Sequence, residues 1–121
     1  MRIEECYQEM DGSYADVIAR LPSPQLIHRF VLKFLEDPSY AALCSAMESG
    51  SQETAFRAAH TLKGVCANLG FARLLESASA LTEILRPEAD TIPEAAFALM
   101  EQVRGDYQRT VDAIRRYRDE A

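Results

Sequence analysis

The sequence predicts an all-α protein, an antiparallel up-and-down four-helix bundle with additional short N-terminal helices. Two observations predict this fold class. Residues that favour helix starts and helix ends recur along the chain, and apolar residues repeat at intervals of three and four, as on one face of an α-helix. The alternation of apolar and polar residues that a half-buried strand needs is missing from the sequence.

The expected helix boundaries follow from local signals. Ser23-Pro24 and Asp37-Pro38 each place a capping side chain before a proline, which is typical of a helix start. Residues 91–94, with the sequence TIPE, form a capping box that includes a proline. Gly50 and Gly70 occur where helices should end. We therefore expect short helices near residues 2–9 and 13–20, followed by helices near 24–36, 38–49, 52–69, 71–86 and 92–118.

The last three of these helices each carry a narrow apolar seam. Narrow seams joined by short loops are typical of antiparallel neighbours in a bundle. The helix near 38–49, as a kinked continuation of 24–36, would be the fourth member. At 121 residues the chain fits one domain, 1–121, with short helices in about 2–20 and the bundle in about 24–118. The seams are Ala55, Ala59, Leu62, Cys66 and Leu69; Leu74, Ala78, Leu81 and Leu85; and Ala96, Met100, Val103, Tyr107, Val111 and Ile114.

Charge disfavours some classes of partner. The net charge of -6 and the pI near 4.9 argue against nucleic acid or an anionic membrane surface, because phosphate binding needs a basic face. The dense basic run at residues 115–118 is followed by two acidic residues. We interpret it as a solvated C-terminal turn, with phosphate binding as the weaker alternative.

Cysteine spacing and hydropathy indicate the compartment. The three cysteines are widely spaced, without a CxxC pair or a histidine placed to complete a zinc site, so no metal is expected and a reduced, cytoplasmic location is favoured. Nothing at the N-terminus resembles a signal peptide, and no apolar run is long enough to span a bilayer. We therefore expect a soluble protein without membrane insertion.

The segment AFRAAHTLKGVCANLG, residues 55–70, holds the candidate functional residues. At about 100° per residue, His60 lies roughly 140° and Gly64 roughly 180° from the centre of the seam, so both should face outward. Lys63 lies at about 80°, on the flank, where its ammonium can swing toward the ring of its i, i+3 neighbour His60. Arg57 and Ala67 complete the outer strip.

Each of these residues also has a purely structural explanation. A glycine in a helix interior costs about 1 kcal/mol relative to alanine, and it commonly relieves crowding against a neighbouring helix. The outward angle of Gly64 favours close approach by another molecule instead. An exposed histidine beside a lysine is, taken alone, usually a solvated surface.

The three residues together favour reversible phosphorylation of the imidazole. Histidine is near neutral at cellular pH, so one ring nitrogen has a lone pair for attack. A phosphoryl group adds about two negative charges, which a lysine one turn along would stabilise. Gly64 would leave room for a donor's active site to close around the ring. No serine or cysteine nucleophile with an acid partner is evident.

The run AHTLKG followed by NLGFARL resembles the signature of histidine-containing phosphotransfer (HPt) domains, a His-x-x-Lys-Gly motif with a glycine and a leucine further on. The resemblance is strongest over residues 52–86. It implies a helical bundle whose exposed histidine carries phosphoryl groups between aspartates of receiver domains in two-component phosphorelays. The chain would be a phosphocarrier without independent enzymatic activity or a cofactor, because the receiver supplies the Mg²⁺ and the acidic pocket. The matching positions are His60, Lys63, Gly64, Gly70 and Leu74.

Two alternatives remain open. One is a substrate domain of a chemotaxis-like histidine kinase, in which a glutamate of the following helix supports the histidine ring. Thr82 occupies the aligned position here, with Glu83 beside it, and this departure favours exchange with a receiver. The other alternative is a helical adaptor that binds its partner without phosphorylation. His28 lacks the motif, since Val31 and Leu32 stand where lysine and glycine would be needed.

The resemblance also implies an apolar docking patch beside the histidine, to which the helices before the bundle contribute. The segment 24–36 has more apolar positions than one buried stripe requires, although burial against the short N-terminal helices would also explain them. An exposed transfer histidine is compatible with a monomer, which we expect. The predicted partner-binding residues are Arg57, Ala67, Ile27, Val31 and Leu35.

Overall fold

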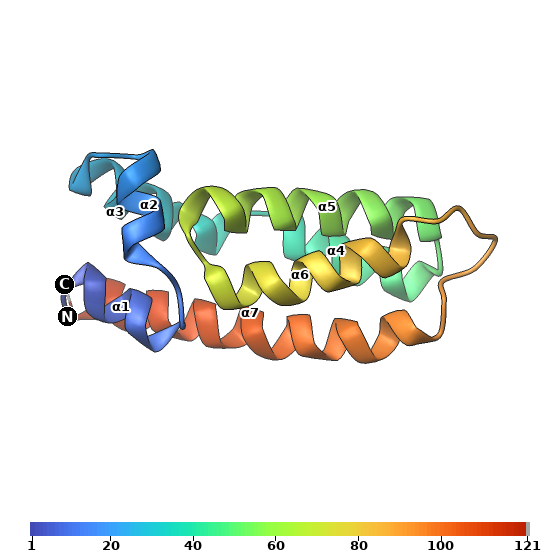
Figure 1. Cartoon of the computed structure of the whole chain (residues 1–121). Helices are drawn as coiled ribbons and strands as arrows, with labels where there is room; N and C mark the ends of the chain where they lie inside the picture. Colours follow the sequence, from blue (N-terminus) through green and yellow to red (C-terminus); the bar gives the residue numbers. More distant parts are fainter. Residues whose placement is uncertain (121) are drawn as a thin grey trace.

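The computed structural model describes residues 1–120, and within this range the chain forms helices and no strand (Figure 1). This confirms the predicted all-α class. The elements are α1 (Ile3–Glu9), α2 (Tyr14–Arg20), α3 (Pro24–Lys33), the short 3-10 helix η1 (Phe34–Glu36), α4 (Ser39–Ser49), α5 (Gln52–Leu69), α6 (Ala72–Leu85) and α7 (Ala95–Asp119).

The four helices α4 to α7 form the bundle. Each packs against the next in the chain, and consecutive helices run in opposite directions (Figure 1). The predicted seams are buried in the shared core, except that Tyr107 is half-buried and stacks on Tyr40, with ring centroids 3.7 Å apart. The up-and-down bundle is therefore confirmed.

Most predicted helix ends have the expected caps. The Ser23 and Ser51 hydroxyls accept hydrogen bonds from Leu26 N and Thr54 N, and Asp37 Oδ1 accepts one from Ser39 N at 2.8 Å. Gly50 and Gly70 end α4 and α5 with φ of 78° and 70°, a left-handed conformation that glycine adopts at little cost. These local signals set the bounds of α5 in particular.

Two boundaries differ from the prediction by more than one residue. The helix expected over 92–118 begins at Ala95, and Glu94 caps it without a side-chain hydrogen bond, so the predicted capping box does not form. Ile92 is buried, and residues 91–94 make a turn that carries this side chain into the core. The helix expected over 24–36 tightens into η1 after Lys33, where Phe34 enters the core.

The short N-terminal helices attach to one end of the bundle. α1 packs along the C-terminal part of α7, so Met1 and Glu120 lie close together (Figure 1). The loop before α2 contacts the α5–α6 turn, where Ser13 N donates to Gly70 O at 2.8 Å. A Cβ at Gly70 would lie 2.5 Å from Ser13 O, so this close approach requires glycine. The C-terminal end of α5 is thereby fixed.

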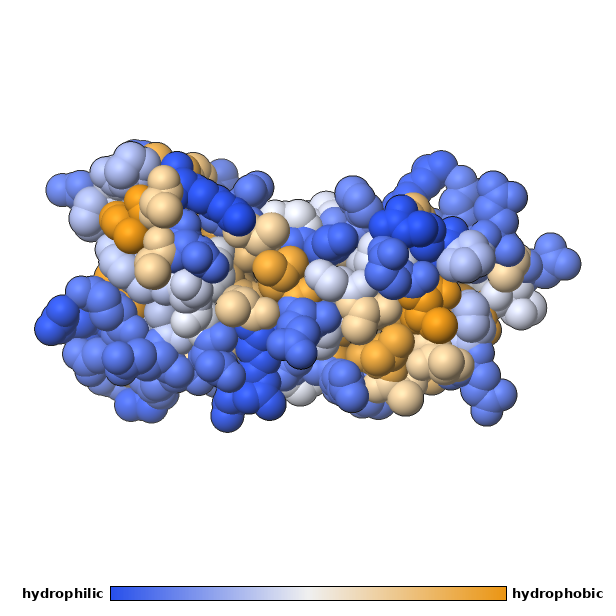
Figure 2. Space-filling view, viewed as in Figure 1, coloured by the Kyte–Doolittle hydropathy of each residue, from blue (hydrophilic) through white to orange (hydrophobic). Residues whose placement is uncertain are grey.

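The face of the molecule seen in Figure 2 carries separate apolar patches along α6 and toward the start of α7, bordered by hydrophilic side chains. Phe97, at the start of α7, is half exposed. No helix in the described part of the chain combines the length and the apolar character needed to cross a membrane.

Candidate functional site

The middle of α5 carries the candidate site. One side of the helix is buried in the core through Ala59, Leu62 and Cys66. His60 and Gly64 are exposed on the other side, one turn apart, and Lys63 is half-buried between the two faces. The helical angles calculated from the sequence therefore agree with the observed exposure. A single rigid helix presents the imidazole to solvent.

Open space surrounds Gly64. A Cβ built on this residue would have no heavy atom within 4 Å outside its own stretch of helix. A glycine that relieves crowding would show a close neighbour, as Gly70 does, so internal packing does not account for Gly64. What the glycine provides is a low, unobstructed surface beside His60.

Phe56 of α5 borders His60 on its other flank, and Arg86, at the end of α6, lies over Phe56. The Phe56 and His60 rings have centroids 6.0 Å apart, and Arg86 Cζ lies 5.1 Å from the Phe56 centroid. Arg86 Nη2 donates to Glu83 Oε2 at 2.7 Å. This hydrogen bond lowers the pKa of the Glu83 carboxyl, and the charges of Lys63 and His60 lower it further. A negative charge thus lies on the same side as the candidate histidine and lysine.

Thr82 does not take part in this arrangement. It is fully buried, and its hydroxyl donates to Ala78 O at 2.7 Å within α6. It therefore has no contact with solvent and cannot support the exposed His60 ring. Glu83, one residue further on, is exposed and lies on the side of His60.

The thiols near the site are not competing nucleophiles. Burial raises the pKa of the Cys66 thiol to about 12, so it stays protonated at neutral pH. Among residues 1–120, no cluster of three or more histidine, cysteine, aspartate or glutamate side chains is placed to hold a metal ion. His60 is thus the exposed candidate nucleophile of this face.

Comparison with protein families matches the Hpt domain model to residues 36–116, most of the chain. The chain belongs to the Hpt domain family. The match covers the bundle α4 to α7 and contains His60, Lys63 and Gly64, while α1 to α3 precede it. Hpt domains carry phosphoryl groups in phosphorelays and interact with receiver domains. The comparisons with curated proteins and with solved structures gave no significant match.

Two of the predicted docking residues of this Hpt domain are wrong. Ile27 and Val31 have no exposed surface, so a partner cannot contact them. Together with Phe34 they occupy positions i, i+4 and i+7, the spacing of one buried helical stripe, and they pack α3 against its neighbours. Leu35 is half-buried. Arg57 is exposed and Ala67 half-buried, both on the His60 side of α5.

Sequence reasoning missed an apolar cleft beside the site. The cleft, of about 600 Å³, lies between α2, α3 with η1, and α5. Its lining includes Leu21 and Val65, and the exposed ring of Phe30. Asn68, one turn after Gly64 on α5, also lines the cleft, so the cleft adjoins the surface of the site. A helical projection of residues 24–36 would have placed Phe30 outside the buried stripe.

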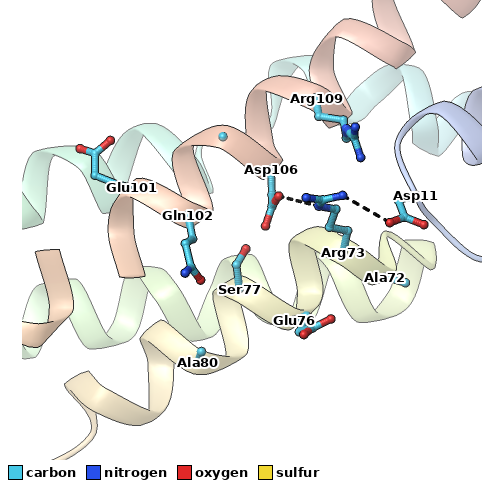
Figure 3. A pocket seen from close by; sticks show the side chains of 11 residues that line it. Asp11, Ala72, Arg73, Glu76, Ser77, Ala80, Glu101, Gln102, Asp106 and Arg109 are labelled. Carbon is cyan, nitrogen blue, oxygen red and sulfur yellow. Dashed lines mark hydrogen bonds and ion pairs between the residues drawn. The ribbon is translucent and has the colours of Figure 1, made fainter. Parts of the chain in front are cut away.

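A second groove lies on another part of the Hpt domain, between α6 and α7 (Figure 3). Arg73 spans it by contacting Asp106 Oδ1 at 2.9 Å and Asp11 Oδ2 at 3.5 Å. The three residues come from α6, α7 and the loop after α1, so the ion pairs join the N-terminal segment to the bundle. The lining of this groove contains no histidine or cysteine, and we assign the groove a structural role.

Proposed function

We propose that this chain is a histidine phosphotransfer protein that accepts a phosphoryl group on His60 from a receiver phosphoaspartate and donates it to the aspartate of another receiver. The observation that supports this most directly is the exposed imidazole one turn from the open surface at Gly64. A receiver's active site needs this access in order to bring its aspartate in line with a ring nitrogen.

The transfer step needs no cofactor on this chain, because one bond to phosphorus forms as another breaks. The lone pair of a His60 ring nitrogen attacks phosphorus, an N–P bond forms, and the electron pair of the breaking P–O bond leaves with the receiver carboxylate. The receiver supplies the Mg²⁺ that offsets charge on the phosphoryl oxygens. Lys63 contributes a second positive charge from this chain. We propose that the chain has no independent enzymatic activity and acts in the cytoplasm as a monomer.

We further propose that the receiver docks over the outer strip of α5 and the neighbouring apolar cleft. Arg57 and Ala67 lie at the two ends of that strip. Leu35 belongs to η1, whose Phe34 and Glu36 line the cleft. Phe30 offers an exposed ring at the cleft. These residues replace Ile27 and Val31 in the predicted patch.

Phosphoryl exchange with a charged receiver tests the proposed function. A receiver domain is phosphorylated with labelled acetyl phosphate, freed of excess reagent and mixed with this chain. We expect label on this chain that is lost in acid and kept in base, the behaviour of a phosphoramidate. Binding to the receiver without label would favour the adaptor. Labelling by a histidine kinase but by no receiver would favour the chemotaxis-like substrate domain.

Replacement of Lys63 by alanine is expected to slow transfer several-fold to tenfold without unfolding the domain. The ammonium stabilises the transferring group by about 1 kcal/mol, because water screens a partly exposed charge. The initial rate of label transfer measures the effect. Arg109→Ala, which removes an exposed cation from α7, is the control and should leave the rate unchanged. An equal loss in both variants would mean that only the net charge matters.

A further inference from the structure

Among the residues that the structure describes, the ring of His60 has one aromatic neighbour, Phe56. The two residues are i and i+4 on α5, so their side chains share a face. Their ring centroids are 6.0 Å apart with the planes tilted by 51°, within the range of favourable aromatic pairs. Within residues 1–120, no hydrogen bond to the His60 ring accompanies this contact. Phe56 is therefore placed where it can limit the orientations of the imidazole.

Phe56 is itself held in place from the next helix. Its side chain is half-buried, and the Arg86 guanidinium lies over its ring at 5.1 Å, within cation–π distance. Arg86 is in turn fixed by Glu83, whose Oε2 accepts from Nη2 at 2.7 Å and from Nε at 3.1 Å. A chain of contacts thus runs from an ion pair at the C-terminal end of α6 through Phe56 to His60.

We propose that Phe56 is a positioning residue for phosphoryl transfer, with Arg86 and Glu83 fixing its ring. The inference rests on the proposed function. A free, exposed imidazole samples several rotamers, whereas in-line attack on phosphorus requires one orientation. Contact with Phe56 restricts the ring before the receiver arrives, so less ordering remains for the transfer step. Phe56 touches neither the phosphoryl group nor the receiver in this role.

A docking role for Phe56 is the competing explanation. A docking residue needs a free face for the partner, but one face of Phe56 lies under Arg86 and its ring also contacts His60. The two roles differ in kinetics. Loss of a positioning residue lowers the transfer rate at saturating receiver, whereas loss of a docking residue raises the receiver concentration that gives half the maximal rate.

The test compares Phe56→Leu and Phe56→Tyr with wild type. Phe97→Leu is the matched control, because Phe97 is an exposed phenylalanine on α7. Leucine keeps much of the apolar volume at position 56 but not the ring, whereas tyrosine keeps the ring. We expect Phe56→Leu to lower the rate at saturating receiver by about threefold to tenfold, the effect of one aromatic contact. The half-saturating concentration should stay unchanged, and Phe56→Tyr and Phe97→Leu should transfer as wild type does.

A second readout does not depend on transfer. In the unphosphorylated domain, NMR should show ring-current shifts of the His60 ring protons and cross-peaks to the Phe56 ring. We expect Phe56→Leu to abolish both and Arg86→Gln to weaken them, while thermal unfolding confirms that the variants are folded.

Three outcomes would overturn the positioning role. They are an unchanged maximal rate in Phe56→Leu, a change in the half-saturating concentration alone, and His60 signals that do not respond to the substitution at position 56. A wild-type chain that accepts no phosphoryl group would instead refute the proposed function. A normal wild-type rate with an insensitive Phe56 variant would refute only the positioning role.

Discussion

Replacement of His60 by glutamine is expected to abolish phosphorylation of the chain completely. Glutamine has a similar polar side chain, but its amide nitrogen has no lone pair available for attack on phosphorus. The fold should persist, because His60 is exposed on α5 and the core lies on the opposite side of the helix. Acid-labile label after incubation with a charged receiver measures the loss, and circular dichroism checks the helical content.

His28 provides the matched control for this experiment. Its Nδ1 shares a hydrogen bond with the Tyr117 hydroxyl, and the two ring centroids are 5.5 Å apart, so its role is to join α3 to the end of α7. His28→Gln should keep full phosphorylation, although loss of the ring contact should reduce thermal stability. Label that persists in His60→Gln, or that disappears in His28→Gln alone, would contradict the assignment of the acceptor.

The bounds of α5 could be predicted from the sequence, whereas the start of α7 could not. Both ends of α5 are set by neighbours in the chain, a serine cap at Ser51 and a left-handed Gly70, so the sequence predicted its bounds to the residue. The start of α7 was predicted three residues too early. The capping-box pattern was present, but the burial of Ile92 depends on packing against other helices, and a local motif contains no information about that packing.

In the candidate site, too, the features set by the local sequence could be predicted and those set by packing between helices could not. The outward position of His60 and Gly64 follows from the helical period, which is a local property. Ile27 and Val31 are buried because they share one helical stripe with Phe34, and the number of apolar residues in the segment does not indicate this period. The contact between Arg86 and Phe56 could not be predicted, since it depends on the register of α6 against α5.

Replacement of Gly64 by glutamine is expected to reduce phosphoryl transfer on the order of 100-fold while the fold stays intact. The fold should tolerate the side chain because an added Cβ would meet no atom within 4 Å. Replacement of a glycine inside a helix also raises the free energy of unfolding by up to about 1 kcal/mol. In a complex the same side chain would stand where a receiver must close over His60. A displacement of the reacting groups by about 1 Å is enough for a loss of this size.

Gly105 provides a control that separates the effect on stability from the effect on transfer. Its surroundings are as open as those of Gly64, but it lies on α7, away from His60. It is an exposed glycine inside α7, and a Cβ there would also meet no atom within 4 Å. Gly64→Ala and Gly105→Ala should therefore raise the free energy of unfolding by similar amounts, measured by chemical denaturation. Transfer kinetics should differ sharply between Gly64→Gln and Gly105→Gln, with only the first impaired. If Gly64→Gln instead unfolded the domain, the glycine would serve internal packing. If it left transfer intact, close approach at this position would not be part of the mechanism.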